Sequence, residues 1–374
     1  MLNAGNLLAN GTAPAPEPVS EGVEISGNVD TIAAFGLDSS NSTAGFPAGI
    51  SDIAGMAAGG GSAKEFRFVV DQAEIDLAKS FGENIRLRAD VDVTDFANTA
   101  HRTGVMVDLE QAYVTANIAA GNGIEFLIGK FNAPVGVDSV DRNNNWLVTY
   151  SPNFRYLTPS NVIGAKIYYA FSDLVDLHFG VVNNLNTIGF GDSSYPSALF
   201  RLGFNWGDEG NESTLGISGG IGPEAGTGAG VADGFSNLDY FGDLDAMVAL
   251  SDTWNLALEG TYRVSDDGVA GGNGSALAGF LAINYEASDV WDLTLRATIH
   301  DELSTGNGVS TNGSGTFNGA GYKGMDLGGS FGAGYAIADG AKMKMEYRFD
   351  MNSTSGAAAN PTHHAALAEF AYTF

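Results

Sequence analysis

The chain has 374 residues, of which 44% are hydrophobic and only 16% are charged, and its formal net charge is −27. The charged share lies well below the roughly 25% of a soluble domain, and the hydrophobic share excludes a disordered chain. The acidic excess excludes nucleic acid as a partner, because phosphates need Lys and Arg. The absence of cysteine excludes thiolate metal sites, c-type haem attachment and disulfides.

The apolar residues are spread along the chain and never form the ~20-residue run that a membrane-spanning helix needs. A closed β-barrel is the other membrane solution, because it pairs every backbone group and alternates apolar with polar side chains. The segment 85–93 illustrates this period of two, with Ile, Leu, Ala, Val and Val on one face and Arg, Arg, Asp and Asp on the other. The pattern predicts an all-β, transmembrane antiparallel barrel.

Residues 1–20 contain three prolines and predict a flexible lead-in, followed by a barrel over residues 21–374. No export signal is recognisable at Met1, so the barrel interpretation implies a mature form or a start after the signal. The alternation then predicts 16 strands, at 22–36, 66–80, 84–96, 108–119, 123–132, 161–171, 175–184, 198–206, 213–221, 239–250, 254–265, 276–286, 290–301, 325–337, 341–351 and 364–374.

The connections between these strands alternate in length. Short turns follow every even-numbered strand, whereas long loops are predicted at 37–65, 97–107, 133–160, 185–197, 222–238, 266–275, 302–324 and 352–363. Short periplasmic turns opposite long extracellular loops are typical of barrels in the bacterial outer membrane. Sixteen strands also place both termini on the periplasmic side, and barrels of ~16–18 strands leave an aqueous channel.

The two faces of the strands differ in charge. The apolar parity carries no charge mid-strand except at Asp71, where a bulge or a later strand start would remove the conflict. The other parity carries many charges, which a packed core would accommodate only at a large desolvation cost. We therefore predict that a water-filled lumen is lined by Arg86, Arg88, Asp90, Asp92, Lys166, Arg201, Arg263, Arg296, Glu346 and Arg348.

Aromatic residues gather at one end of the predicted barrel. Trp206, Trp254 and Trp291 lie beside short turns on the outward parity, and the chain ends at Phe374. Amphipathic rings favour the membrane–water interface, so these residues predict a periplasmic girdle. Ordinary strand aromatics packed on a core are the alternative, but they would not cluster at one end. The alternating aromatic ending also resembles the signature that bacterial barrel-assembly machinery recognises.

Four short motifs occur in a fixed order: GKFNAPVGV at 129–137, DRNNNW at 141–146, GAKIYY at 164–169 and GVVNN at 180–184. This order resembles the β-barrel porin-2 family, often called OmpL-like, and the resemblance covers roughly residues 65–185. The resemblance implies an outer-membrane porin and leaves its substrates open.

The loop 133–160 is the candidate constriction. In general porins the loop at this topological position folds into the lumen, which is an analogy at the level of fold. The alternative is a solvated surface loop with ordinary charges. The predicted constriction residues are Asp138, Asp141, Arg142, Trp146 and Arg155.

The predicted function is passive diffusion of small hydrophilic solutes and ions, with a preference for cations because carboxylates outnumber bases on the inward parity. Arginines at the narrowest point would give the opposite preference. Expected partners are outer-membrane lipid, lipopolysaccharide and further copies of the chain in a trimer. A surface adhesin with a closed lumen, or a barrel sheath for an electron-transfer protein, remain alternatives.

Chemistry beyond passage is not expected. The adjacent residues His363 and His364 point to opposite faces of a strand and cannot easily chelate one ion. No local context of a nucleophile and base surrounds the histidines. We therefore predict no enzyme activity, no metal and no cofactor.

Overall fold

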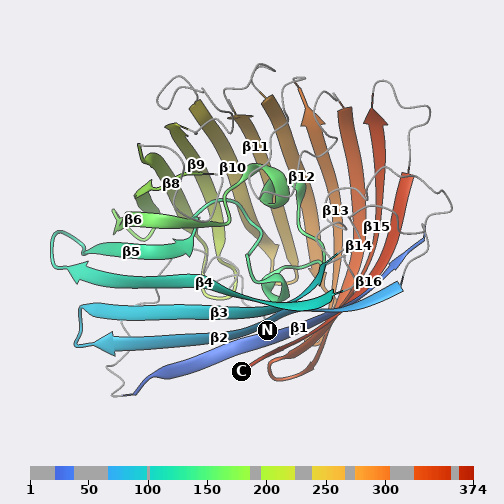
Figure 1. Cartoon of the computed structure of the whole chain (residues 1–374), viewed down its shortest axis with the longest axis horizontal. Coiled ribbons are helices and arrows are strands. Elements are labelled where there is room, and N and C mark those ends of the chain that lie inside the picture. Colours follow the sequence, from blue (N-terminus) through green and yellow to red (C-terminus); the bar gives the residue numbers. More distant parts are fainter. Residues whose placement is uncertain are drawn as a thin grey trace.

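The computed structural model describes residues 22–37, 66–98, 102–185, 195–223, 238–265, 274–303, 324–354 and 362–374. The lead-in 1–20 and most of the predicted long loops lie outside the described residues. Sixteen antiparallel strands form one closed barrel, in which each strand pairs with its neighbours in the chain and β1 pairs with β16 (Figure 1). Among the described residues, no helix is long and apolar enough to span a membrane.

The strands confirm the predicted fold class and strand count. They are β1 (Glu24–Gly36), β2 (Phe66–Phe81), β3 (Ile85–Asn98), β4 (Arg102–Ile118), β5 (Ile124–Asn132), β6 (Asn161–Ala170), β7 (Val175–Val182), β8 (Ser197–Trp206), β9 (Ser213–Pro223), β10 (Leu238–Ser251), β11 (Trp254–Ser265), β12 (Gly274–Glu286), β13 (Trp291–Glu302), β14 (Gly324–Ala338), β15 (Ala341–Thr354) and β16 (Thr362–Thr373).

Alternation along each strand sorts side chains between the two faces of the barrel. On β13, Leu293 and Leu295 are exposed on the outside, whereas Thr294 and Arg296 are buried on the inside. Exposed large apolar residues recur in this way on strand after strand. An apolar outer surface is stable only against lipid, so the alternation places the barrel in a membrane.

The predicted long connection at 97–107 is wrong. Strand β3 continues to Asn98 and β4 already begins at Arg102, with Asn98 opposite Arg102 in the register. The sequence pattern ends where the outward face ceases to be apolar. Backbone pairing needs no apolar face, and so the two strands extend further than the pattern does.

Two β-bulges turn additional polar side chains toward the inside. On β2 the register steps from Gln72 to Val70 and leaves Asp71 as the extra residue, which confirms the bulge considered for this position. On β4 it steps from Gln111 to Leu109 and leaves Glu110 extra. A bulge places two successive side chains on one side of a sheet. Carboxylates of two residues thus face the interior against the alternation.

Two glycines of the sequence motifs meet at the short strands β5 and β6. Gly129 pairs with Gly164 in the register. A Cβ on Gly129 would lie 2.1 Å from the backbone oxygen of Ala112, and the residue has a φ of +142°. Only glycine fits such a close approach in this conformation. The motifs therefore help to fix the point at which β5 leads into the loop 133–160.

The aromatic residues beside the short turns lie on the outer surface. Trp206, Trp254 and Trp291 are 43%, 44% and 39% exposed, and Phe374 is 53% exposed. Trp254 stacks on Tyr285 at a ring-centroid distance of 4.5 Å. Their contact with the membrane–water interface stays a prediction.

Candidate functional site

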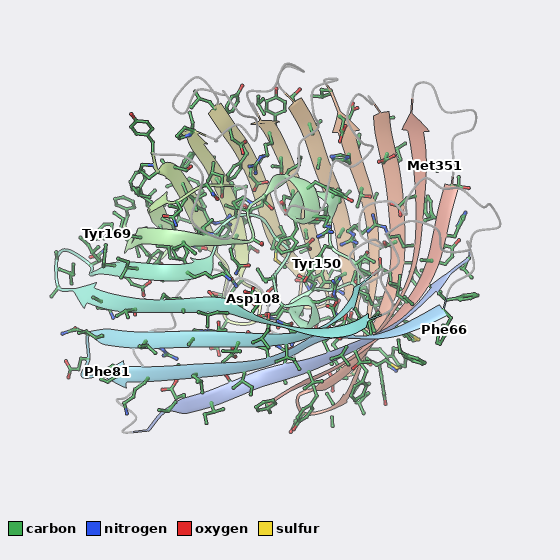
Figure 2. All side chains as sticks on the ribbon, viewed as in Figure 1. Phe66, Phe81, Asp108, Tyr150, Tyr169 and Met351 are labelled. Atoms are coloured by element: carbon green, nitrogen blue, oxygen red, sulfur yellow. The ribbon has the colours of Figure 1, made fainter. Side chains whose placement is uncertain are left out.

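The loop 133–160 lies inside the barrel and is mostly buried (Figure 1). It contains two short helical turns, η1 (Arg142–Asn144) and η2 (Asn153–Leu157). Figure 2 places Tyr150 of this loop within the barrel, whereas Phe66 and Phe81 mark the two ends of β2. The loop contacts two different parts of the inner wall, and the two contacts differ in chemistry.

The first part is the anchoring wall, formed by the inward side chains of β11 to β15. Three of its bases donate hydrogen bonds to backbone carbonyls of the loop: Arg263 to Leu157 at 2.9 Å, Arg296 to Thr149 at 2.7 Å, and Lys344 to Arg142 at 2.8 Å. Arg348 likewise donates to the carbonyl of Tyr150 at 3.2 Å. The loop has little regular structure, so its buried carbonyls depend on such donors.

The same bases also pair with carboxylates. Arg348 forms two hydrogen bonds to Asp350, at 2.8 and 2.9 Å, and Lys344 lies 2.8 Å from Glu369. Arg263 pairs with Asp239, and Arg296 lies 3.8 Å from Glu346. These four bases are 0–6% exposed. Their charges are therefore neutralised locally and shielded from water.

Apolar contacts reinforce this attachment. Val137 and Trp146 of the loop pack against inward residues of β10 to β12, including Met247 and Phe280. On the side of β1 and β16, Val148 packs against Ile32 and its neighbours. Sequence reasoning missed these residues because it treated the inward parity as uniformly polar. The available signal was the run of apolar residues on that parity of β10 to β12.

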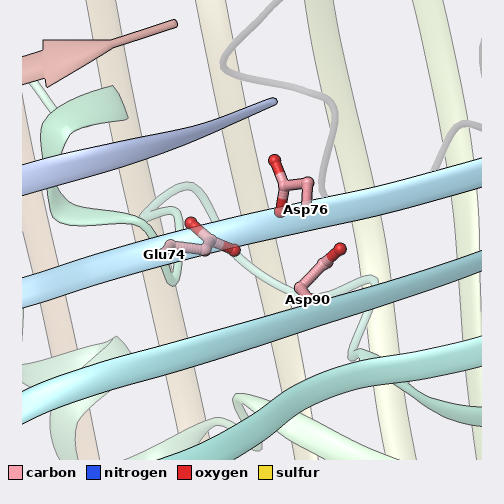
Figure 3. A group of neighbouring side chains, drawn as sticks. All are labelled: Glu74, Asp76 and Asp90. Carbon is pink, nitrogen blue, oxygen red and sulfur yellow. The ribbon is translucent and has the colours of Figure 1, made fainter. Parts of the chain in front are cut away.

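The second part is the acidic wall, formed by the inward side chains of β2 to β4. Figure 3 shows three of its carboxylates, Glu74 and Asp76 on β2 and Asp90 on the neighbouring β3. Asp92 and the two bulge residues lie nearby, and the loop adds Asp141. In full, the carboxylates gathered here are Asp71, Glu74, Asp76, Asp90, Asp92, Glu110 and Asp141.

Among the described residues, two guanidinium groups form ion pairs with these carboxylates. Arg88 lies 2.8 Å from Asp90 and 3.5 Å from Asp76. Arg142 of the loop donates to Asp71 at 2.6 Å, and its guanidinium lies 4.2 Å from the ring centroid of Tyr150. The remaining carboxylates surround the uncharged amide of Gln72. The acidic wall thus retains an excess of negative charge.

Asp141 brings the loop to this wall. Its Oδ1 accepts a hydrogen bond from Nε2 of Gln72 at 3.2 Å. Burial raises the pKa of the Asp141 carboxyl to about 6, and the hydrogen bond from Gln72 opposes that rise. This loop carboxylate therefore changes charge close to physiological pH.

The predicted constriction residues have distinct surroundings. Asp141 and Arg142 meet the acidic wall, whereas Trp146 packs on the anchoring side. Asp138 accepts a hydrogen bond from the backbone N–H of Ser151 at 2.6 Å and so closes the loop on itself. Arg155 lies on η2. Their role in narrowing a pore stays a prediction.

The ten predicted pore-lining residues are not equally accessible. Six are buried: Asp90, Lys166, Arg263, Arg296, Glu346 and Arg348. The other four, Arg86, Arg88, Asp92 and Arg201, are partly exposed. Arg201 forms two hydrogen bonds to Asp245, at 2.5 and 2.7 Å, while Lys166 lies 5.2 Å from the ring centroid of Phe131. Whether these residues line an open pore stays a prediction.

The family described as "Putative beta-barrel porin-2, OmpL-like" matches residues 22–374. The chain belongs to this family. It is accordingly a porin-like channel protein of the outer membrane, and the match extends the resemblance from residues 65–185 to the entire barrel. No curated protein matches the chain.

Solved porin structures share the fold at low sequence identity. The outer-membrane channel DcaP of Acinetobacter baumannii aligns with a TM-score of 0.64 at 12% identity, covering 96% of this chain and 99% of that one. OmpT of Vibrio cholerae, folded in vitro, aligns with a TM-score of 0.60 at 12% identity, covering 97% and 100%. An anion-selective porin from Comamonas acidovorans aligns with a TM-score of 0.60 at 13% identity, covering 94% and 99%.

Proposed function

We propose that the chain forms a water-filled channel for passive diffusion of small hydrophilic solutes and ions, with a preference for cations. The loop 133–160 forms the constriction in this proposal. One observation carries it: the bases that face the loop are buried in its attachment, whereas the carboxylates of the acidic wall exceed their basic partners.

The strongest competing expectation is an arginine-controlled, anion-selective constriction. Arg142 is 3% exposed and pairs with Asp71. Arg88 pairs with Asp90. Arg296 and Arg348 lie beneath the loop, where they bond its carbonyls. A guanidinium that is paired and shielded contributes little field to a passing ion, so these arginines favour no anion pathway.

The carboxylates favour cations for the complementary reason. A passage with low-dielectric walls and one prevailing sign of charge concentrates the opposite ion. Asp76, Asp92 and Asp141 are only partly buried and lie on the acidic wall and the loop that meets it. The fold alone does not fix the sign, because the anion-selective porin from Comamonas acidovorans has a similar barrel.

The test is the reversal potential of single channels in a planar bilayer across a KCl gradient, with a chelator present. We expect cation preference at ~0.1 M salt and a weaker preference at ~1 M, where the screening length falls from ~10 to ~3 Å. Asp76→Asn combined with Asp92→Asn should reduce the preference. Asp289→Asn, which removes an exposed carboxylate from a short turn, is the control. Anion preference of the unmodified channel at low salt contradicts the proposal.

We further propose that the chain forms a homo-trimer surrounded by outer-membrane lipid and lipopolysaccharide. Support comes from the apolar outer surface and from the trimer form of OmpT of Vibrio cholerae, which aligns with a TM-score of 0.57 at 13% identity. Cross-linking in lipid and native mass measurement would test this. A monomer under both conditions contradicts it.

The interior position of the loop favours a channel over a sheath, because the chain's own loop lies where a partner protein would have to enter. Conductance separates the channel from a closed adhesin or structural barrel. Refolded protein that inserts into the bilayer without any current would favour the latter.

A further inference from the structure

Four carboxylates of the acidic wall and loop converge on one uncharged amide. Nε2 of Gln72 lies 3.4 Å from Glu74, 3.1 Å from Asp92, 3.5 Å from Glu110 and 3.2 Å from Asp141. An amide nitrogen carries two hydrogens, so it cannot satisfy four acceptors. We call these four residues the four-acid cluster.

No base among the described residues neutralises the four-acid cluster. Arg88 is directed to Asp90 and Asp76, and Arg142 is directed to Asp71. Buried carboxylates are normally paired with bases or coordinated to metals. The cluster has neither partner from the described part of the chain, although Glu74 and Glu110 are only 3% and 2% exposed.

An observation outside the carboxylates points in the same direction. Asn28 of β1 lies opposite Glu74 in the register and donates its amide N–H to that carboxylate. Asn28 is 4% exposed, yet its Oδ1 has no hydrogen-bond partner within the described ranges. Oε1 of the bulge residue Glu110 is likewise unpartnered there. Buried oxygens of this kind are rare in folded proteins unless an ion or ordered water contacts them.

The geometry fits a calcium ion. Glu74, Asp92 and Glu110 each offer one carboxylate oxygen, and these atoms lie within 4.8 Å of one another. Oxygens around one Ca²⁺ lie about 2.3–2.6 Å from it and can therefore be up to about 5 Å apart. Mg²⁺ needs shorter distances, near 2.0–2.1 Å, and strict octahedral geometry. An amide carbonyl such as that of Asn28 is also an ordinary calcium ligand.

A neighbouring group, drawn in Figure 3, is less suitable. Glu74, Asp76 and Asp90 also offer oxygens within 4.8 Å of one another. Arg88, however, already pairs with Asp76 and Asp90. A divalent ion there would have to displace or tolerate that guanidinium, so we place the ion on the side of Asp92 and Glu110.

We propose that Glu74, Asp92 and Glu110 form a calcium site on the inner wall of the barrel, and that Asp141 joins it from the loop. The site ties the loop 133–160 to β2–β4 by a metal ion, as basic side chains tie it to β11–β15. Because calcium binding is measured without any current, its outcome is independent of whether the channel prefers cations.

The test is isothermal titration calorimetry of the refolded, chelator-stripped full chain with CaCl₂ alone. We expect saturable binding of a single ion per chain, and a loss of affinity of about tenfold or more in Glu110→Gln and in Asp92→Asn. The matched control is Asp326→Asn, which neutralises another buried inward carboxylate that lies on β14. This control should keep the affinity of the unmodified protein.

A second variant covers the case in which Glu110→Gln fails to refold. Gln72→Lys places an ammonium group among the four carboxylates, and should abolish calcium binding. Calcium should raise the thermal unfolding temperature of the unmodified barrel but not that of Gln72→Lys. The proposal is overturned by absence of saturable binding to the unmodified protein. It is equally overturned by unchanged affinity in Asp92→Asn or Gln72→Lys.

Discussion

The anchoring wall and the acidic wall carry the same sequence signal, charged residues on the inward parity, but put it to different uses. Arg296 and Arg348 on β13 and β15 contact backbone carbonyls of the loop and are buried by it. Glu74 and Asp92 on β2 and β3 face other carboxylates. The difference teaches that an inward charge is defined by what the loop presents to it.

Hydrogen-bond chemistry explains why the two walls diverge. A backbone carbonyl only accepts, so a loop with exposed carbonyls requires bases opposite it. Carboxylates on the anchoring side are satisfied by loop N–H groups: Glu259 accepts from Val137 at 2.9 Å and Glu346 accepts from Thr149 at 2.8 Å. On the acidic wall, by contrast, the loop presents a further carboxylate, that of Asp141.

Breaking the anchoring wall should have the largest effect. Arg348→Met leaves Asp350 without its bidentate partner and the carbonyl of Tyr150 without a donor. Removing one partner of a buried pair costs roughly 3–5 kcal/mol. We expect this loss in urea unfolding of the barrel in lipid, together with noisier single-channel current as the loop loosens. Unchanged stability and quiet current would contradict the anchoring function of Arg348.

The outer face sharpens the comparison, since it rejects a charge one residue away from a position that requires it. Leu295 is 61% exposed beside the buried Arg296. Leu295→Arg should cost roughly 2–4 kcal/mol near the membrane midplane, and Leu293→Arg, closer to the girdle residue Trp291, roughly 0–1. Refolding yield in lipid measures both. Equal yields would count against the assigned depth. Thr294 is no suitable control, because it is 1% exposed and bonds Asn284.

A change of pH should weaken the acidic wall without altering the anchoring contacts of Arg348. The pKa of Asp141 is raised to about 6 by burial, so its negative charge is present above that pH and lost below it. Cation preference should therefore be smaller at pH 5 than at pH 7.5. The reversal potential of Asp141→Asn should respond less to pH. The same response in both proteins would assign the effect to other carboxylates.

The smallest effect is expected where a charge pair lies in water. Arg86 at the short-turn end of β3 lies 3.0 Å from Glu24, with side chains 24% and 42% exposed. Exposed pairs contribute about 0–1 kcal/mol because water and salt screen them. Arg86→Met should change the free energy of unfolding by less than about 1 kcal/mol. A loss as large as that of Arg348→Met would remove the distinction between buried and exposed pairs.

Particular elements show how far the sequence reached. The strands β11 and β13 could be placed because a lipid-facing parity tolerates no charge, and Trp254 and Trp291 begin them beside short turns. The start of β4 could not be placed, since pairing continues there without an apolar face. The bulge at Asp71 was detectable as a parity conflict. The bulge at Glu110 was not recognised in this way.

The sequence by itself determined the barrel, its strand number and its outer face, because these follow from a period of two and from loop length, which are local properties. Tertiary structure decided what each inward charge contacts. The loop 133–160 meets strands that lie more than a hundred residues away, as in the bond from Lys344 to Arg142. Such contacts depend on the path of one irregular segment through a closed barrel, and no local periodicity encodes that path.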